Sequence, residues 1–193
     1  MILNLVFHDV RPDGERLTRK IDISESFFQQ LVKKSEELAQ SSDTLFDEVH
    51  YHFDDGYDSF LTRIEPHLEG IEKNRILLAI YPETIGKKGY LTSDEVKSLE
   101  QKGYRVASHG YSHVALAIEG EETRQGGEYR NRPFGRSEVL SSEEVRFQLE
   151  ESKNVLEEWF GRSVTEFVTP FGNDNAHVRD MVQKYYDVIY VSE

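Results

Sequence analysis

The stretch "RILLAIYP" at residues 75–82 is an almost continuous run of apolar side chains. A strand with one face in water alternates apolar and polar residues, whereas a strand that is buried on both faces is apolar along its whole length. Strands of the second kind are typical of parallel sheets, because helices cover both faces of such sheets. The stretch therefore predicts a buried strand of an α/β fold.

On either side of this run, expected strands and helices alternate along the chain. Hydrophobic periodicity and turn residues predict strands at 2–10, 48–53, 104–108, 164–170 and 186–192, and helices at 24–40, 58–68, 91–103, 141–161 and about 175–185. Such alternation indicates a parallel sheet or barrel with its functional loops at the carboxyl ends of the strands.

Local signals mark several of these helices. Thr92 with Glu95, and Ser141 with Glu144, have the spacing of capping boxes. The helix at 58–68 is expected to bend or end near Pro66. The helix at 24–40 is expected from four apolar residues at helical spacing, which are Phe27, Phe28, Leu31 and Leu38.

Composition limits the possible functions. The 193 residues fit a single domain over 1–193, and the net charge of −13 argues against nucleic acid or an anionic membrane surface as a partner. No apolar run is long enough for membrane insertion, and the first residues lack the features of a signal peptide, which favours a cytoplasmic location. The chain has no cysteine, so disulfides and thiolate metal sites are excluded.

One segment, at about 117–140, has no periodicity. It is rich in glycine and carries several arginines, among them Arg132, so we expect a long loop inserted over one face of the domain. Arg132 could bind an anionic substrate, because arginine binds carboxylates and phosphates in a bidentate way. Alternatively, the arginines could pair with the interspersed glutamates in a solvated loop.

Three polar stretches directly follow expected strands: "FDDG" at 53–56, "SHGYSH" at 108–113 and "TPFG" at 169–172. His109 and His113 are four residues apart, a spacing that lets two imidazoles reach one ion, and an aspartate from "FDDG" would complete a three-ligand set. Three protein ligands leave a position open for water, which is typical of catalytic metal sites. The other aspartate could then act as a base toward that water. A plain turn and two unrelated histidines remain the structural alternative.

The three stretches, in this order, resemble the motifs of the polysaccharide deacetylases of carbohydrate esterase family four. "HFDDGYDSF", "SHGYSH" and "VTPFG" match the first, second and third motifs, and the flanking text is similar from residue 2 to residue 191. The resemblance implies an irregular (β/α)7-type barrel. It also implies a metal-dependent hydrolase that removes an acetyl or related acyl group from an N-acetylated sugar or polysaccharide precursor.

Carried over by position, the resemblance implies that Asp54 is the general base and that Asp55, His109 and His113 bind a divalent metal. The metal would most often be zinc, with cobalt, nickel or manganese as other choices. The backbone N–H of Phe171 would meet the oxyanion. Pro170 and Gly172 complete that substrate-binding turn, and Tyr57 and Tyr111 could stack on a sugar ring or pack in the core.

The chain also departs from the family pattern. Val168 stands where the third motif often has an arginine that orients the base. The chain stops at Glu193, before the strand that usually supplies a histidine as general acid, so we expect a barrel that is incomplete at its C-terminal end. His8 or His177 could replace that histidine. An incomplete barrel leaves sheet edges uncovered, which makes a homodimer possible.

Several functions therefore stay open. A catalytically degenerate, deacetylase-like sugar-binding domain is the main alternative to an active hydrolase. Non-haem iron oxygenases also use two histidines and one carboxylate, although the adjacent second aspartate suits hydrolysis better. In the last alternative, the aspartates and histidines are only structural and no ion binds.

Overall fold

The computed structural model describes residues 1–41, 45–116, 140–172 and 175–191. The expected loop at 117–140, with Arg132, lies outside the described residues except for Leu140. The chain divides into two compact units, the first formed by 1–78 and 85–105 and the second by 79–84 and 106–193. The single-domain expectation over 1–193 stays a prediction.

The main sheet has six strands whose order follows the chain without reversal. The strands are β1 (Ile2–Phe7), β4 (Glu48–Asp54), β5 (Ile76–Ile80), β6 (Arg105–Ser108), β7 (Glu166–Val168) and β8 (Val188–Tyr190). A doubly wound sheet would reverse its order, whereas a barrel adds each new strand beside the last. The expected α/β class and incomplete barrel of parallel strands are therefore confirmed.

The stretch that predicted the class forms β5, and all five of its residues are buried. Strands β5 and β6 each contribute residues to both units. A second, two-stranded sheet pairs β2 (Val10–Arg11) with β3 (Ile23–Ser24) in the first unit.

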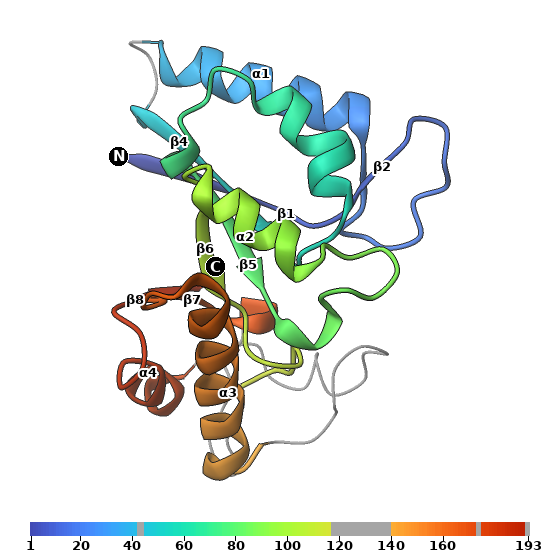
Figure 1. The fold of residues 1–193 in the computed structure, drawn as a ribbon. Coiled ribbons are helices and arrows are strands. Elements are labelled where there is room, and N and C mark those ends of the chain that lie inside the picture. Colours follow the sequence, from blue (N-terminus) through green and yellow to red (C-terminus); the bar gives the residue numbers. More distant parts are fainter. Residues whose placement is uncertain (42–44, 117–139, 173–174, 192–193) are drawn as a thin grey trace. The chain divides into compact units, whose positions relative to one another are not determined.

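In the first unit, α1 (Glu25–Ala39) begins after the N-cap Ser24 and contacts β4 (Figure 1). Its buried face carries Phe28 and Val32, whereas Phe27 is 50% exposed and Leu38 is 38% exposed. Helical spacing correctly placed the helix, but it could not say which of two adjacent phenylalanines faces the core. The reason is that adjacent helix positions are only about 100° apart, so a broad apolar stripe can include both residues while the core covers one of them.

Aromatic rings form a layer between α1, β1 and β4. Phe28 meets Phe7 edge-on with ring centroids 5.1 Å apart, and Phe53 lies 5.6 Å from Phe7 and 5.2 Å from Phe60. All four rings are buried. Since Phe53 immediately precedes Asp54, this layer fixes the end of β4 from which the aspartates project.

The helix expected at 58–68 is broken into two unusual turns. A π-helix, η1 (Phe60–Ile64), runs into a 3₁₀ helix, η2 (Glu65–Leu68). The N–H of Glu65 reaches the carbonyl of Phe60, five residues back. Pro66 lacks an N–H and cannot continue a regular α-helix, so the predicted interruption at this residue is confirmed.

Both predicted capping boxes are present. The Thr92 box begins α2 (Ser93–Gln101) in the first unit, and the Ser141 box begins α3 (Ser142–Phe160) in the second. In each box the hydroxyl accepts the N–H of the glutamate three residues later, and the glutamate accepts the N–H of the cap. Gly161 ends α3 with a left-handed backbone (φ 65°).

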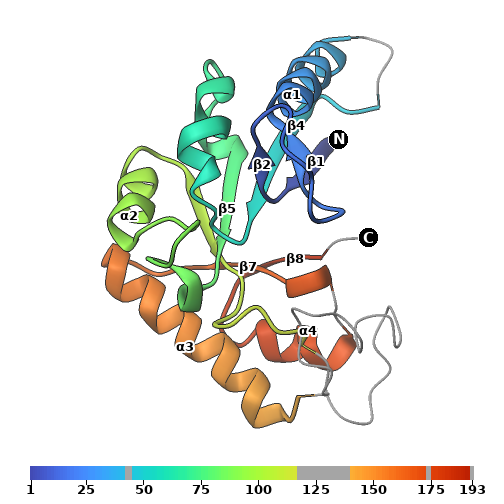
Figure 2. The ribbon, with the colours of Figure 1, turned by 90° about the vertical axis from the view of Figure 1, so that its right-hand side faces the viewer.

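In the second unit, α3 lies beside α4 (Ala176–Val182) in both ribbon views (Figure 1, Figure 2). The core of the second unit includes buried polar side chains. The hydroxyl of Ser152 on α3 bonds to Ser108 at the end of β6 (2.8 Å) and lies 3.1 Å from the Tyr186 hydroxyl. No helix in the described part of the chain is both long and apolar enough to cross a bilayer.

Candidate functional site

The carboxylate loop, residues 54–57, begins at the last residue of β4 in the first unit. Asp54 and Asp55 are both buried, with 8% and 4% of their surfaces exposed. Asp55 and Gly56 both have positive φ angles, 76° and 75°. A left-handed aspartate is uncommon. Because two such residues follow the strand, the chain turns sharply at this point, and adjacent aspartates need not alternate as strand neighbours do.

Contacts from distant parts of the sequence hold this loop. The Gly56 carbonyl accepts the N–H of Leu91 (2.9 Å), and the Tyr57 ring stacks on Tyr90 with centroids 4.9 Å apart. The Arg19 guanidinium lies 4.7 Å from the centre of the Tyr57 ring and donates to its hydroxyl. The Tyr57 ring therefore already contacts an aromatic ring and a cation, and its expected stacking on a sugar stays a prediction.

Arg19 is itself fixed by carboxylates. It pairs with Asp22 at 2.6 Å and with Asp9 at 3.4 Å, while Arg11 also pairs with Asp9 at 2.9 Å. These ion pairs join the segment between β2 and β3 to Tyr57. The sequence analysis missed Arg19, since no local pattern links it to a tyrosine 38 residues away.

Asp54 lies in an unusual electrostatic environment. Burial and the adjacent Asp55 raise its pKa well above the ordinary aspartate value. His8, just past β1, has its Nε2 3.9 Å from an Asp54 carboxylate oxygen. Burial lowers the pKa of His8, although Asp55 opposes that shift. A carboxyl group with a raised pKa is a stronger base, which suits proton transfer near neutral pH.

The histidine loop, residues 109–113, follows β6 in the second unit. The N–H of His109 donates to the Ile80 carbonyl (2.8 Å), and its ring Nδ1 lies 2.8 Å from the Val168 carbonyl. A carbonyl can only accept, so Nδ1 carries the proton and Nε2 presents a lone pair. This is the way in which metal-binding histidines are usually oriented.

His113 ends the loop with a left-handed backbone (φ 51°). Its ring is stacked on Tyr81 with centroids 5.1 Å apart and lies 4.4 Å from the ring of Phe171. The centroids of the two imidazoles, His109 and His113, are 4.8 Å apart. Aromatic neighbours thus limit the rotation of the His113 ring.

A glutamine on α3 fills the inside of the histidine loop. The Oε1 of Gln148 accepts the backbone N–H groups of Tyr111 (3.0 Å) and Ser112 (2.9 Å), and its Nε2 donates to the Ser112 hydroxyl (2.9 Å). Gln148 is only 7% exposed. The sequence analysis missed it, because a glutamine between apolar helix positions has no distinctive signature.

The third motif forms the turn η6 (Pro170–Gly172) in the second unit. Phe171 and Gly172 both have positive φ angles, 59° and 62°. Val168, which replaces an expected arginine, contributes its backbone carbonyl to His109. Elsewhere in the second unit, Tyr111 meets Phe147 edge-on at 5.4 Å, and His177 is exposed on α4.

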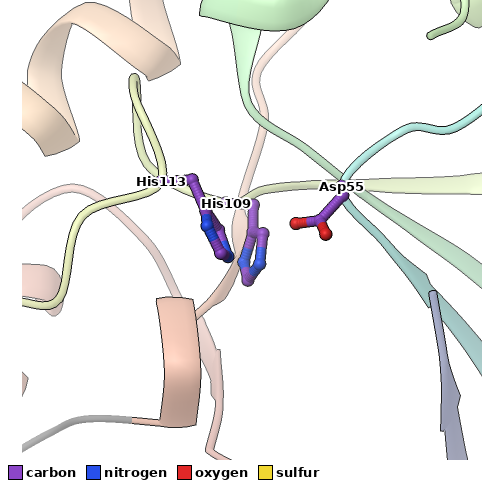
Figure 3. A group of neighbouring side chains, drawn as sticks. All are labelled: Asp55, His109 and His113. Atoms are coloured by element: carbon purple, nitrogen blue, oxygen red, sulfur yellow. The ribbon is translucent and has the colours of Figure 1, made fainter. Parts of the chain in front are cut away.

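Asp55, His109 and His113 form a group that could hold a metal ion, because one ligand atom of each lies within 4.8 Å of those of the other two (Figure 3). These are the three residues that the sequence analysis expected as ligands. Two imidazoles and one carboxylate suit zinc and similar divalent ions. The protonated Nδ1 of His109 also fits, since it leaves Nε2 available.

The comparison with protein families agrees with these motifs. The family model for polysaccharide deacetylase matches residues 42–186, which is well over half of the chain. The chain therefore belongs to the polysaccharide deacetylase family. The match covers all three motifs and the strands that precede them. No curated protein matches the chain.

Solved structures show the same fold at low sequence identity. A polysaccharide deacetylase from Bacillus cereus aligns with 100% of this chain and 58% of its own, at 17% identity and a TM-score of 0.69. The Streptococcus pyogenes deacetylase PplD, in complex with acetate, aligns with 100% of this chain and 84% of its own, at 15% identity and a TM-score of 0.72. A mutant of a CE4 family pseudoenzyme, with restored enzymatic activity, aligns with 72% of this chain and 43% of its own, at 18% identity and a TM-score of 0.51.

The chain thus spans little more than half the length of the Bacillus cereus protein. Likeness at these identities supports the fold. Activity, substrate and partners are proposals.

Proposed function

We propose that this chain is a metal-dependent hydrolase that removes an acetyl or related acyl group from an N-acetylated sugar. The observation that carries the proposal is the group formed by Asp55, His109 and His113, directly adjacent in sequence to a second buried carboxylate, Asp54. A hydrolase of this kind needs a ligand set with an open position and a separate base. The adjacent aspartates supply one of each.

In this proposal, Asp55, His109 and His113 hold a divalent ion, most often zinc, with cobalt, nickel or manganese as substitutes. The ion would lower the pKa of a water molecule and polarise the amide carbonyl. Asp54 takes the proton of the attacking water, a task that suits its raised pKa. The backbone N–H of Phe171, in a turn with a positive φ angle, would be the donor for the oxyanion.

His8 is our candidate for the group that gives a proton to the leaving nitrogen. It is partly buried, with 22% of its side chain exposed, and lies 3.9 Å from Asp54. Because burial lowers the pKa of His8, its ring carries no extra proton at neutral pH. In this proposal it would take up the proton that Asp54 removes from the water and pass it to the leaving nitrogen. His177, the other candidate from the sequence, lies exposed on α4, so we assign it no role.

The substrate class comes from the family, and so it is part of the proposal. We propose an acylated sugar or oligosaccharide, in line with a family of polysaccharide deacetylases. The particular sugar stays open. The cytoplasmic location, the homodimer and the substrate contacts of Tyr111, Pro170 and Gly172 stay predictions.

The decisive test measures acetate release and metal content together. Zinc-loaded and cobalt-loaded protein is incubated with N-acetylglucosamine oligosaccharides, and acetate is quantified. We expect Asp54→Asn to keep its metal but to lose about 10²- to 10⁴-fold in rate, as is usual when a general base is removed. Asp58→Asn, at an exposed aspartate just beyond the loop, is the matched control and should stay active. Equal activity of the Asp54→Asn protein would overturn the assigned mechanism.

A degenerate sugar-binding domain is the second candidate function. One observation that favours a binding domain is Val168, which stands where the family often has an arginine. Another is the fold that the chain shares with the mutant of a CE4 family pseudoenzyme. The same assay separates the two candidates. Metal and oligosaccharide binding without acetate release, from every acylated sugar tested, would establish the binding domain.

A further inference from the structure

We propose that Gln148 is a positioning residue for the metal ligands: its side-chain amide holds the histidine loop in the shape that lets His109 and His113 share one ion. The inference rests on the proposed function, because it assigns a task to a residue beside the same metal site. It adds a residue on α3 that bonds to the backbone of the histidine loop.

The contacts of Gln148 go to the middle of the histidine loop. Between the two imidazoles lie three residues, and Gln148 bonds to two of them through three hydrogen bonds of 2.9 to 3.0 Å. Its orientation is determined by its partners, since two backbone N–H groups require an acceptor and only Oε1 can supply it. The amide nitrogen then faces the Ser112 hydroxyl. In this orientation each of the three hydrogen bonds pairs a donor with an acceptor.

The loop needs such support because its backbone is unusual. Gly110 and His113 both have positive φ angles, 73° and 51°. A left-handed histidine costs conformational energy, and such residues persist only where surrounding contacts impose them. Gln148 Oε1 would lie 3.5 Å from a Cβ added at Gly110, so the amide packs directly under this turn.

Two other backbone hydrogen bonds also hold the loop, but neither involves the N–H groups of Tyr111 or Ser112. The Ile80 carbonyl holds the N–H of His109 (2.8 Å), and the Glu83 N–H donates to the Tyr111 carbonyl (3.1 Å). Gln148 accepts the N–H groups of both Tyr111 and Ser112. Without it, two backbone donors between the imidazoles would need new partners, and the backbone that joins the two histidines would lose its contact with α3. Outer contacts of this kind typically change metal affinity about 10- to 100-fold.

The test compares three variants by zinc affinity, measured by competition with a chelator. Gln148→Met keeps the shape of the side chain but removes the amide, and we expect zinc to bind about 10- to 100-fold more weakly. Gln148→Glu should restore affinity, because a carboxylate accepts both N–H groups and the Ser112 hydroxyl can rotate to donate. Ser112→Ala removes one hydrogen bond only and should have a smaller effect. It also keeps the inference testable if Gln148→Met does not fold.

Glu157→Met is the matched control. Glu157 lies on the same helix and accepts the backbone N–H of Val164 (2.9 Å), so it also ties α3 to a loop, but away from the histidines. We expect this variant to lower the melting temperature without changing zinc affinity. The cobalt absorption spectrum gives a second readout, because its bands report ligand geometry. They should shift in Gln148→Met and stay unchanged in Glu157→Met.

The possible outcomes separate the inference from the proposed function. If wild type binds zinc and Gln148→Met and Ser112→Ala bind it equally well with unchanged cobalt spectra, Gln148 is only a structural tie and the inference fails alone. If wild type binds no divalent ion, the proposed hydrolase fails and the inference fails with it. Weaker zinc binding in Gln148→Met, restored in Gln148→Glu, would support the inference whether or not acetate is released.

Discussion

The carboxylate loop and the histidine loop both follow parallel strands, but the chain holds them with different chemistry. The carboxylate loop is held by a cation and by aromatic rings, through Arg19, Tyr57 and Tyr90. The histidine loop is held by neutral groups, the amide of Gln148 and the carbonyl of Val168. The cation reaches the carboxylate loop through a tyrosine ring, whereas the neutral groups bond directly to the backbone and ring of the histidine loop.

The difference has a physical reason. Two adjacent buried carboxylates repel each other, which contributes to the raised pKa of Asp54. The Arg19 guanidinium reaches this loop only through the Tyr57 side chain and is itself paired with Asp9 and Asp22. Histidines must be neutral to bind a metal, and a carboxylate partner would favour the protonated ring. A carbonyl orients the imidazole of His109 without adding a charge. The carbonyl of Val168 thus orients a neutral His109 directly, whereas Arg19 stabilises the carboxylate loop through the Tyr57 ring.

The aromatic layer behind the carboxylate loop gives the largest expected effect on stability. Phe28 is fully buried in the aromatic layer behind the carboxylate loop. Phe28→Ala should destabilise the protein by about 3 to 5 kcal/mol, the usual cost of removing a buried phenylalanine ring. Urea unfolding at neutral pH measures the change. Phe27→Ala, at the adjacent half-exposed position on α1, should cost less than about 1 kcal/mol. Equal losses in the two variants would contradict the observed orientation of the helix.

His52, a buried histidine of the first unit, should make the free energy of unfolding depend on pH, with an effect smaller than that of Phe28→Ala. Burial lowers the pKa of His52 on β4 to about 4, and Arg105 and His50 add to the shift. His52 takes up a proton near pH 6.5 in the unfolded chain but only near pH 4 in the folded chain. The free energy of unfolding is therefore unaffected by His52 above pH 6.5 and decreases as the pH falls from 6.5 toward 4. We expect a loss of about 2 kcal/mol from this residue between pH 7 and pH 5.

The control for this prediction is His52→Leu, which removes the titrating group and keeps a buried side chain. Free energies of unfolding are measured in urea at both pH values. The difference between the two pH values should be smaller in the variant by about 2 kcal/mol. An identical pH dependence in the two proteins would show that His52 keeps an ordinary pKa when folded.

Much of the fold could be predicted from the sequence, because its signals are local. The apolar run at 75–82 became the buried strand β5, and the residues Thr92 and Ser141 cap α2 and α3 as expected. The segment at 58–68 was harder to predict. Its interruption at Pro66 could be seen, but a π-helix depends on tertiary contacts that no short pattern encodes.

The same distinction applies to the candidate site. Asp55, His109 and His113 could be predicted as a group, since each lies in a short motif that follows a strand. Arg19 and Gln148 could not, because each acts through a contact with a residue more than thirty positions away. The replacement of an arginine by Val168 suggested a loss at this site, yet the backbone carbonyl of the same residue orients His109.

The smallest expected effect tests whether the two units unfold together. The capping boxes at Thr92 and Ser141 have nearly the same geometry, and one lies in each unit. Thr92→Ala and Ser141→Ala should each cost about 1 kcal/mol, because each removes one N-cap hydrogen bond. If 1–193 is a single cooperative domain, both variants shift the same calorimetric transition by similar amounts. Two transitions, each sensitive to only one of the variants, would contradict the single-domain prediction, and the two loops would then belong to separately stable parts of the chain.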